Sequence, residues 1–321
     1  MKNCSVIVTG GGGFLGSHLV EKLLSLGHSV VAIDNFCTGD RNNLKYLKSL
    51  PGSAERLRFI EDDCTKPWPE LLGDVKDLTW VFHLASPASP PLYQQMPLET
   101  LRVNTTGLKE ALMYATPRGA RVIFASTSEV YGDAAVHPQP EHYWGNVNSF
   151  GPRACYDEAK RFGEALVYSW NQVHGTRHGL VRIFNTYGPR MNPSDGRVVI
   201  NFLKQLVEKA PITIYGDGKQ TRSFCFVSDM IAGFLAYATS DLAEPVNLGN
   251  PKEFNMLELA DVVKSLDASY SCNFEYRPMP VDDPKQRQPD IGKAKKLLGW
   301  APKVELREGL AEMHRWLKSV L

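Results

Sequence analysis

The sequence lacks any hydrophobic run long enough to cross a membrane, since nowhere does it hold about 18 consecutive apolar residues. It also lacks an excess of charge of either sign. Its 36 Lys and Arg residues against 35 Asp and Glu residues leave a formal net charge of +1, without the broad basic or acidic surface typical of proteins that bind nucleic acid or anionic lipid. We therefore expect a small molecule as the partner, with no nucleic acid and no membrane.

Paired cysteines are also missing. The six cysteines form no C-x-x-C pair and no His/Cys cluster with zinc spacing. They are Cys4, Cys37, Cys64, Cys155, Cys225 and Cys272. We expect reduced thiols and no metal site. Residues 1–9 run straight into a strand-like segment rather than a targeting signal, which favours a cytoplasmic location.

Short β-branched segments alternate with longer amphipathic ones over residues 1–185, a pattern typical of βαβ units around a parallel sheet. The predicted strands are Ser5–Val8, Ser29–Ile33, Arg58–Ile60, Thr79–Leu84, Arg121–Ser126 and Leu180–Phe184, with helices starting near Phe14, Pro97 and Arg153. The predicted fold class is α/β, a Rossmann-type doubly wound parallel sheet that binds ligands at the carboxyl ends of its strands.

The rest of the chain is richer in Gly and Pro and has a mixed pattern. It predicts helices near Val198–Glu208, Met256–Leu266 and Leu306–Leu317, and a strand at Ile212–Tyr215. A chain of 321 residues also exceeds one compact core of ordinary size. We expect a Rossmann domain over residues 1–185, to which residues 225–250 can return, and a smaller mixed α/β substrate lobe over residues 186–321.

A glycine-rich segment follows the first predicted strand. It reads TGGGGFLG at Thr9–Gly16, with Gly10, Gly13 and Gly16 between a strand and a helix. Glycines there permit a tight turn and let backbone N–H groups approach a pyrophosphate at the positive end of the helix. Because glycine-rich turns are common, a dinucleotide site needs support from the residues after the neighbouring strands.

Residues after the next three strands give that support. Asp34 ends the second strand, where a carboxylate can bind the ribose hydroxyls of adenosine; the alternative is that it only caps a loop. Because Asn35 and Phe36 follow, with no adjacent Arg or Lys to bind a 2′-phosphate, NAD is favoured over NADP. We also expect Asp63 to reach the adenine and Leu84–Ser86 to line the cofactor.

A tyrosine and a lysine follow the fifth predicted strand. STSEVYG at Ser126–Gly132 ends that strand, and YDEAK at Tyr156–Lys160 begins the next helix, so the Tyr and Lys lie on one helix face. The charge of Lys160 is expected to favour the tyrosinate, which can take a hydroxyl proton while a hydride leaves to a nicotinamide. Thr127 can share that hydroxyl. Alone, the pair would equally fit a solvated helix face.

With these motifs the chain resembles the extended short-chain dehydrogenases/reductases of the NAD-dependent epimerase/dehydratase family and, within them, the UDP-glucuronate decarboxylases, also called UDP-xylose synthases. The resemblance spans nearly the whole chain. Its motifs are DNFCTG at Asp34–Gly39, HLASPASP at His83–Pro90, YWGNVN at Tyr143–Asn148, GPRACYDEAKR at Gly151–Arg161, RIFNTYGPRM at Arg182–Met191, DGRVVINF at Asp195–Phe202, YGDGKQTRSFCFVSD at Tyr215–Asp229, PVNLGNP at Pro245–Pro251 and DDPKQRQPDIGKAKKLLGWAPKV at Asp282–Val304.

The chain departs from this family at a few positions. Ala159 stands where the family usually has Gly, Cys37 where it often has Phe, and Ser149–Phe150 where it often has Pro-Ile. These changes remove no group that the chemistry needs, but they leave room for a homologue that acts on a related uronic acid.

The resemblance implies NAD as the cofactor, a UDP-sugar as the substrate, and a homodimer packed through two long helices near Pro97–Ala115 and Arg153–Val173. The expected catalytic residues are Thr127, Glu129, Tyr156 and Lys160. The expected cofactor-binding residues are Gly10, Gly13, Phe14, Leu15, Gly16, Asp34, Asn35, Phe36, Thr38, Gly39, Asp63, Leu84, Ala85, Ser86, Asn104, Ser126, Tyr156 and Lys160. The expected substrate-binding residues are Asn185, Arg197, Val198, Tyr215, Arg222 and Arg287.

By the same resemblance, Asn185 and Arg222 hold the diphosphate, Tyr215 lies near the uracil, and Arg287 lies near the sugar and the diphosphate. Without it, a surface ion pair is the alternative for each arginine.

The activity that the resemblance implies is decarboxylation of UDP-glucuronate to UDP-xylose. Oxidation at C4 makes the C6 carboxylate a β-keto acid, whose C–C electrons can be delocalised into the new carbonyl as carbon dioxide leaves. Protonation at C5 and hydride return then give UDP-xylose with no net redox change, so NAD is expected to stay tightly bound. Glu129 is the candidate for positioning the sugar and for proton transfer at the ring, with Thr127 and Tyr156 at the C4 oxygen.

Three other functions fit the core motifs. A nucleotide-sugar 4,6-dehydratase has a Glu that matches Glu129; dehydratases of dTDP-glucose have Asp where this chain has Ser128, but those of GDP-mannose also show Thr-Ser-Glu. A 4-epimerase needs no acid at position 129. A catalytically idle NAD-binding protein is the third alternative. The presence of all four candidate catalytic residues argues against it: Thr127, Glu129, Tyr156 and Lys160.

Overall fold

The computed structural model describes residues 4–271, 273–278 and 286–321, and the chain divides into two compact units. Unit 1 comprises Met1–Thr127, Ser149–Arg182 and Phe234–Val246. Unit 2 comprises Ser128–Asn148, Ile183–Gly233 and Asn247–Leu321. Both units are therefore discontinuous in sequence. Unit 1 includes Phe234–Val246, which lies within the residues 225–250 that were allowed to return to it, but Ser128–Asn148 belongs to unit 2 rather than to the first domain.

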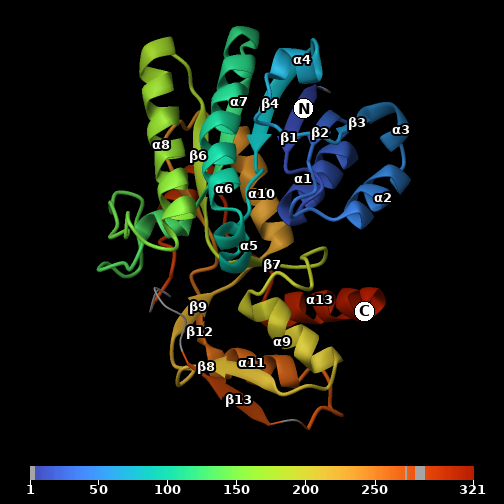
Figure 1. The fold of residues 1–321 in the computed structure, drawn as a ribbon, viewed down its shortest axis with the longest axis vertical. Coiled ribbons are helices and arrows are strands. Elements are labelled where there is room, and N and C mark those ends of the chain that lie inside the picture. The colour runs from blue at the N-terminus through green and yellow to red at the C-terminus, as the bar shows by residue number, and fades with distance from the viewer. Residues whose placement is uncertain (1–3, 272, 279–285) are drawn as a thin grey trace. The chain divides into compact units, whose positions relative to one another are not determined.

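In the described part of unit 1, strands alternate with helices (Figure 1). The strands are β1 (Ser5–Thr9), β2 (Ser29–Ile33), β3 (Leu57–Ile60), β4 (Leu78–His83), β5 (Arg121–Thr127) and β6 (Gly179–Ile183), the last of which ends at the unit boundary. The helices are α1 (Phe14–Ser25), α2 (Arg41–Ser49), α3 (Ser53–Arg56), α4 (Trp68–Leu72), α5 (Pro90–Gln95), α6 (Pro97–Arg102), α7 (Leu108–Ala115) and α8 (Ala154–His174), with a 3-10 turn η2 (Thr116–Arg118).

Seven of the described strands form one sheet in the order β11-β6-β5-β4-β1-β2-β3, in which β11 is Val246–Leu248. Strand β1 pairs in parallel with β2 and β4, and the pairs β2–β3 and β4–β5 are also parallel. The strand order reverses beside β1, as in a Rossmann sheet, whose ligands bind outside the carboxyl ends of the strands at that reversal. The predicted fold class is confirmed.

The strands of the sheet are apolar because both of their faces are covered. Val6, Ile7 and Val8 of β1 are completely buried, as expected for β-branched residues in the centre of a parallel sheet. Helix α8 packs against β5 at Gly163, where a Cβ would lie 2.5 Å from the Phe124 ring. Glycine at this position therefore allows the close approach of α8 to the strand that ends in Thr127.

The long helix expected near Pro97–Ala115 is present, but it is not α-helical throughout. Helices α6 and α7 are joined by a π-helix, η1 (Val103–Gly107). Its sequence, VNTTG, consists of poor helix formers, which makes a local change in the hydrogen-bonding pattern less unfavourable. The expected helix that starts near Arg153 is confirmed as α8, which lies beside α6 and α7 (Figure 1).

Unit 2 is a mixture of helices and short strands. Its elements are the 3-10 helix η3 (Ser128–Tyr131), strands β7 (Thr186–Tyr187), β8 (Ile212–Tyr215), β9 (Thr221–Ser223), β10 (Cys225–Phe226), β12 (Glu253–Asn255) and β13 (Phe274–Arg277), and helices α9 (Val198–Val207), α11 (Met256–Lys264), α12 (Gly292–Leu298) and α13 (Leu306–Val320). Helix α10 (Val227–Ala238) starts in unit 2 and ends in unit 1. The short strands pair as β10–β7, β12–β9 and β13–β8. The longer helices and β8 were predicted, whereas α10, α12 and the other short strands were not.

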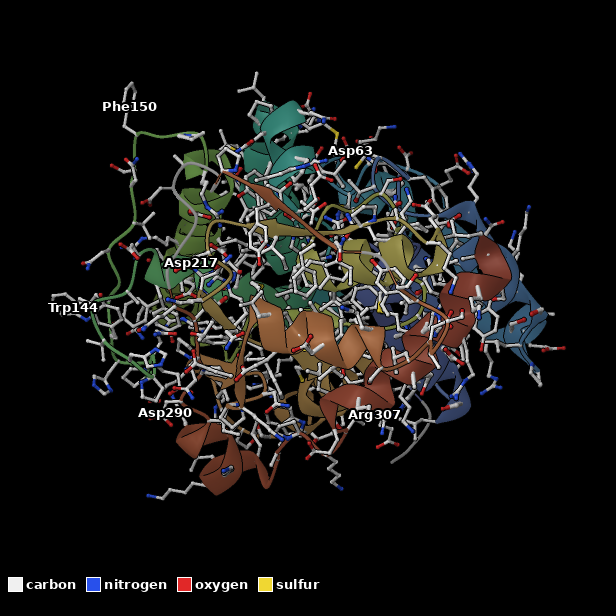
Figure 2. All side chains as sticks on the ribbon, turned by 90° about the horizontal axis from the view of Figure 1, so that it is seen from below. Asp63, Trp144, Phe150, Asp217, Asp290 and Arg307 are labelled. Carbon is white, nitrogen blue, oxygen red and sulfur yellow. The ribbon has the colours of Figure 1, made fainter. Side chains whose placement is uncertain are left out.

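Two aromatic side chains lie far out on the surface of their units. Trp144, in the YWGNVN motif of unit 2, is 87% exposed, and Phe150 of unit 1 is 97% exposed (Figure 2). Among the described residues, no helix is long and apolar enough to cross a membrane. The five cysteines that the structure describes are free thiols, as the sequence predicted.

Candidate active site

The glycine turn after β1 leaves no room for side chains. Gly10 has φ +72°, and a Cβ on it would lie 2.9 Å from Ala85 N. A Cβ on Gly16 would overlap the carbonyl of Gly10. Helix α1 begins directly afterwards with Gly13 as its N-cap, which has no side chain to bond the N–H groups of the first turn. These N–H groups and the positive end of the helix can therefore bind an anionic diphosphate.

Asp34 lies against this turn. Its Oδ2 accepts a hydrogen bond from Gly12 N at 2.8 Å, and its Oδ1 accepts one from Phe36 N at 2.8 Å. Burial raises the pKa of the carboxyl, and the backbone hydrogen bonds oppose this rise. The structure thus brings the expected ribose-binding carboxylate to the expected diphosphate-binding turn. The two groups fit the adenosine end of NAD.

The loop after Asp34 leads to Arg41, the first residue of α2, whose positive charge was not taken into account in the sequence analysis. The Arg41 guanidinium lies 4.6 Å from the centre of the Phe36 ring, and its Nη1 donates to Glu61 Oε2 at 2.6 Å. A 2′-phosphate would have to compete with Glu61 for this arginine. Gly39 also packs closely, since a Cβ on it would lie 2.9 Å from Asp34 Oδ1.

The residues expected to line the cofactor after β3 and β4 lie in loops of unit 1. Asp63 accepts a hydrogen bond from Thr65 N at 2.9 Å, so it shapes its own loop. Ala85 N donates to Thr9 Oγ1 at 3.2 Å. Asn104, completely buried in the π-helix, donates from Nδ2 to Ser86 Oγ at 2.9 Å. The structure therefore joins Asn104 to the loop after β4.

His83 lies in one of the family motifs but was assigned no role from the sequence. It connects the end of β1 to the start of the π-helix. Its Nδ1 lies 3.0 Å from Thr9 Oγ1, and its Nε2 lies 3.0 Å from Val103 O, the first carbonyl of the π-helix. Burial lowers the pKa of His83 to about 3, and the charge of Lys160 adds to this effect. The ring is therefore neutral, and because a carbonyl only accepts, Nε2 carries the hydrogen.

The candidate catalytic residues of unit 1 lie at the end of β5 and on the first turns of α8. Lys160 Nζ donates to Ala125 O at 2.8 Å and lies 5.6 Å from the centre of the Tyr156 ring. Tyr156 stacks on Tyr93 with ring centres 5.0 Å apart. Burial lowers the pKa of Lys160 to about 7. The ammonium thus bridges the helix to the strand that ends in Thr127.

A largely buried ion pair that the sequence did not reveal lies further along α8. Glu164 accepts two hydrogen bonds from Arg182, at 2.9 Å from Nε and 2.7 Å from Nη2. Ser126, which was expected to bind the cofactor, donates from Oγ to Glu164 Oε1 at 2.6 Å. These contacts join β5, β6 and α8, so Ser126 holds the helix in this structure.

In unit 2, Glu129 forms an ion pair with Arg287 although the two are far apart in sequence. Arg287 Nη1 donates to Glu129 Oε1 and lies 3.4 Å from Ser128 Oγ, and its Nη2 donates to Gly132 O at 3.3 Å. The Arg287 side chain is only 4% exposed. The alternative of a surface ion pair is therefore wrong for this arginine.

The other expected substrate-binding residues also lie in unit 2. Arg197 is the N-cap of α9, which begins at Val198, and it pairs with Asp195 with a distance of 2.9 Å from Nη2 to Oδ2. Tyr215 ends β8 and is 37% exposed. Asn185 O accepts from Cys225 N at 2.9 Å.

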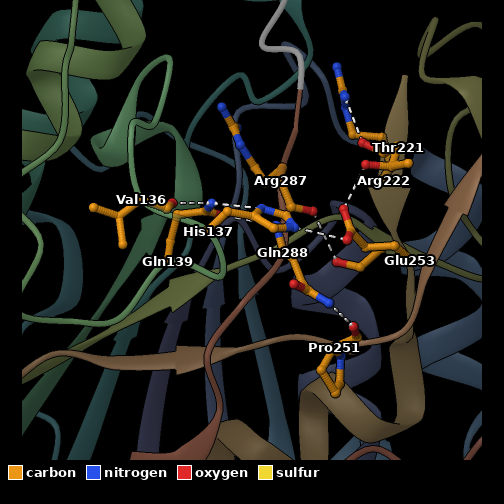
Figure 3. Close-up of polar contacts among 10 residues, drawn as sticks. Val136, His137, Gln139, Thr221, Arg222, Pro251, Glu253, Arg287 and Gln288 are labelled. Atoms are coloured by element: carbon orange, nitrogen blue, oxygen red, sulfur yellow. Dashed lines mark hydrogen bonds and ion pairs between the residues drawn. The ribbon is translucent and has the colours of Figure 1, made fainter. Parts of the chain in front are cut away.

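Arg222 lies on β9, beside the segment that carries Arg287. Its Nη1 donates to Thr221 O at 2.8 Å (Figure 3). The next residue, Ser223, donates from Oγ to Arg287 O at 3.5 Å. The structure therefore brings these two arginine-bearing segments together. Residues 282–285 of the last family motif lie outside the described residues.

Comparisons with known proteins agree with this geometry. A family model described as the NAD dependent epimerase/dehydratase family matches residues 6–249. The chain is 50% identical over 312 residues to UDP-glucuronic acid decarboxylase 1 of Arabidopsis thaliana, covering 97% of this chain and 69% of that protein. It is 48% identical to UDP-glucuronic acid decarboxylase 1 of Danio rerio, covering 95% and 70%.

Solved structures of similar fold include epimerases. UDP-glucose 4-epimerase of Thermotoga maritima, solved with UDP-glucose, has a TM-score of 0.89 at 28% identity, covering 98% of this chain and 99% of that one. UDP-glucuronic acid 4-epimerase of Bacillus cereus, solved with UDP-glucuronic acid and NAD, has a TM-score of 0.87 at 28% identity, covering 99% and 100%. The chain belongs to the NAD dependent epimerase/dehydratase family.

Proposed function

We propose that this protein is an NAD-dependent UDP-glucuronate decarboxylase that forms UDP-xylose. The observation that carries this proposal is the 50% identity over 97% of the chain to a UDP-glucuronic acid decarboxylase. The candidate catalytic residues Thr127, Glu129, Tyr156 and Lys160 are all present in the chain.

The residues of unit 1 fit NAD. The glycine turn and the start of α1 would hold the diphosphate, and Asp34 the adenosine ribose. When bound, NAD supplies the hydride acceptor and donor of a reaction with no net redox change. The Asp34 carboxylate would repel the 2′-phosphate of NADP. Accordingly, Asp34→Ala should weaken NAD binding and reduce the ratio of NAD affinity to NADP affinity. Titration of the ligand-free protein with each cofactor would measure both affinities. Equal affinity of the wild type for both cofactors would contradict this assignment.

Proton transfer at the sugar C4 oxygen is assigned to unit 1. Tyr156 would take the proton of the C4 hydroxyl as the general base, and Thr127 would share a hydrogen bond with the same oxygen. The Lys160 ammonium, 5.6 Å from the Tyr156 ring, would stabilise the tyrosinate. The stacking of Tyr156 on Tyr93 limits the movement of the phenol.

Binding of the sugar carboxylate is assigned to Arg287, with Glu129 placed for proton transfer at the ring. Because Arg287 is already paired with Glu129, part of its charge is compensated before substrate arrives. A fully available cation would stabilise the C6 carboxylate most strongly in the ground state, before its charge is lost with carbon dioxide. An arginine that is also paired with Glu129 can bind that carboxylate but stabilises it less, and so it opposes the loss of carbon dioxide less.

The test is incubation of the protein with UDP-glucuronate and detection of carbon dioxide and a UDP-pentose by mass spectrometry. UDP-glucose is expected to be a poor substrate, because it cannot form a β-keto acid.

Arg287→Ala is expected to lower kcat/KM for UDP-glucuronate by roughly one to two orders of magnitude, as for loss of a hydrogen bond to a charged group. The affinity of the same variant for UDP, which has no sugar, would show how much of this loss comes from weaker binding of the diphosphate rather than of the sugar carboxylate.

The same assay distinguishes the alternatives. A dehydratase would form a 4-keto-6-deoxy sugar from a neutral sugar nucleotide without carbon dioxide. A 4-epimerase would convert UDP-glucuronate to its C4 epimer of unchanged mass, which chromatography separates. Either product, formed without carbon dioxide from UDP-glucuronate, would overturn the decarboxylase proposal.

We further propose a homodimer and a cytoplasmic location. The dimer is supported by exposed apolar residues on the neighbouring helices α6 and α8: Leu98 is 73% exposed, Phe162 49% and Val173 77%. The location is supported by the free thiols of the described cysteines, which are typical of a reducing compartment. Fluorescent tagging of the full-length protein would test the location.

A further inference from the structure

We propose that Gln139 is a positioning residue of the active site, which acts by fixing the chain segment that carries Arg287. The inference rests on the proposed function, because it gives Arg287 a role in substrate binding. Gln139 belongs to unit 2, is only 1% exposed, and lies in none of the motifs that carry the family resemblance. Figure 3 shows it directly beside Gln288, the residue after Arg287.

Gln139 holds this segment through both its backbone and its side chain. Gln139 N donates to Gln288 O at 2.9 Å, and Gln288 N donates back to Gln139 Oε1 at 2.8 Å. Asp290 N donates to Gln139 O at 3.0 Å. The orientation of the amide is also determined, because Gln139 Nε2 donates to Val136 O at 2.8 Å, which leaves Oε1 for Gln288 (Figure 3).

A second buried amide supports the first. Asn247, completely buried, donates from Nδ2 to Gln139 O at 2.9 Å and to Asp290 O at 3.1 Å. Its Oδ1 accepts a hydrogen bond from Tyr131 OH at 2.7 Å, which orients this amide as well. The segment at Gln139 and the segment at Gln288–Asp290 are thus held together by a connected network of buried hydrogen bonds. Such a network favours a single conformation.

The position of the segment matters because the Arg287 side chain has several fixed partners. Its guanidinium reaches Glu129, Ser128 and Gly132 while almost completely buried. A buried ion pair is favourable only when its geometry is good. Displacement of the Gln288 backbone would move the start of the Arg287 side chain and weaken these contacts. Gln139 therefore acts through Arg287 rather than on the substrate.

The test is a double-mutant cycle of Gln139→Met and Arg287→Met. Gln139→Met keeps the side-chain length but removes the side-chain hydrogen bonds to Val136, His137 and Gln288. It is expected to lower kcat/KM for UDP-glucuronate roughly tenfold in the wild type, with NAD affinity unchanged. In the Arg287→Met background its effect is expected to fall to within about twofold, because the placement of an absent guanidinium no longer matters.

Gln205→Met is the matched control in the same unit. Gln205 also accepts from a backbone N–H, Thr213 N at 3.1 Å, and donates from Nε2 to Thr213 Oγ1 at 2.9 Å. Its loss removes two similar hydrogen bonds away from the Arg287 segment, so it should lower Tm while kcat/KM stays within about twofold. Tyr131→Phe removes the hydroxyl that donates to Asn247. It is expected to lower kcat/KM roughly threefold, and it replaces Gln139→Met in the test if that variant does not fold.

Equal losses from Gln139→Met, or from Tyr131→Phe in its place, in both backgrounds would overturn the proposal, as would an equal loss of kcat/KM in Gln205→Met. Failure of the proposed function is a separate result: the wild type would then release no carbon dioxide from UDP-glucuronate. In that case the same cycle is measured on the urea unfolding of ligand-free protein. A smaller effect of Gln139→Met in the Arg287→Met background supports the link between the two residues, and additive effects refute it.

Discussion

The ring of Tyr156 is held by packing contacts that a phenylalanine ring would also make. Its ring stacks on Tyr93 and lies beside the Lys160 ammonium, and the residue is only 6% exposed. The position of the ring and the chemistry of the hydroxyl can therefore be separated by a conservative substitution.

We expect Tyr156→Phe to abolish turnover while NAD binding is retained, because phenylalanine preserves the stacking but cannot take a proton. Loss of a general base lowers the rate roughly 10²–10⁴-fold. Steady-state kinetics and calorimetric NAD titration would measure the two effects. Near-normal turnover of the variant would refute the assignment of Tyr156.

Lys160 is expected to make the stability of the ligand-free protein depend on pH. Its folded pKa of about 7 lies below the value of about 10.4 in an unfolded chain. Between these values the unfolded state binds more protons, so stability rises with pH. Below pH 7 the penalty for burying the charge is fully present.

Lys160→Met removes this penalty. The variant is therefore expected to gain stability relative to the wild type near pH 6–7, and the gain should shrink by about 1.4 kcal/mol per pH unit above that range. Urea unfolding of both proteins at pH 6, 8 and 9.5 would measure the difference. A difference that does not change with pH would contradict it.

At the scale of elements, helix α8 is fixed to the sheet by Glu164. This carboxylate bonds Arg182 of β6 and Ser126 of β5, and the Arg182 and Glu164 side chains are 11% and 15% exposed. Removing one charge from such a pair leaves the other buried and uncompensated, whereas replacing both with apolar side chains is often tolerated.

Accordingly, Arg182→Met is expected to lower the free energy of unfolding by about 3–5 kcal/mol. The double variant Arg182→Met/Glu164→Met is expected to recover most of this loss. Chemical denaturation of the wild type and of the single and double variants would decide. A double variant no more stable than the single one would show that the paired charges are not the cause.

Local patterns in the sequence predicted the strands of unit 1 well, but they missed its helices α2 to α5 and most of the short strands of unit 2. Strands such as β1 and β2 are buried on both faces and bounded by glycine or polar residues, so their ends were visible in the sequence. The strands β7 and β10 have two residues each, too few to show alternation, and were missed. The π-helix was also missed, since its hydrogen bonding depends on tertiary contacts such as that from His83.

The candidate site residues also differ in how far the sequence could predict their contacts. The glycine turn, Asp34 and the Tyr156–Lys160 pair are local in sequence, and the structure brings each group together as the spacing predicted. Contacts over a long sequence separation, such as Glu129 with Arg287 or Glu164 with Arg182, carry no periodic signal. They are set by the tertiary fold and became visible only in the structure.

At the scale of the whole molecule, the exposed apolar residues of α6 and α8 bear on assembly. Phe162→Glu combined with Leu98→Glu places charges on both helices. We expect the wild type to sediment as a dimer at micromolar concentration and the double variant as a monomer that still binds NAD. Leu297→Glu, at an exposed leucine of α12 in unit 2, is the control and should remain a dimer. A monomeric wild type would refute the proposed assembly.

The π-helix at Val103–Gly107 has a consequence for how the chain can change in length. A π-helix closes each hydrogen bond one residue further along than an α-helix does, so it holds one residue more than a continuous helix needs. Deleting one residue there would let α6 and α7 join as an ordinary helix with their packing intact. The same deletion would remove or displace Asn104, which contacts Ser86. The shortened chain is therefore expected to fold but to bind the cofactor less well.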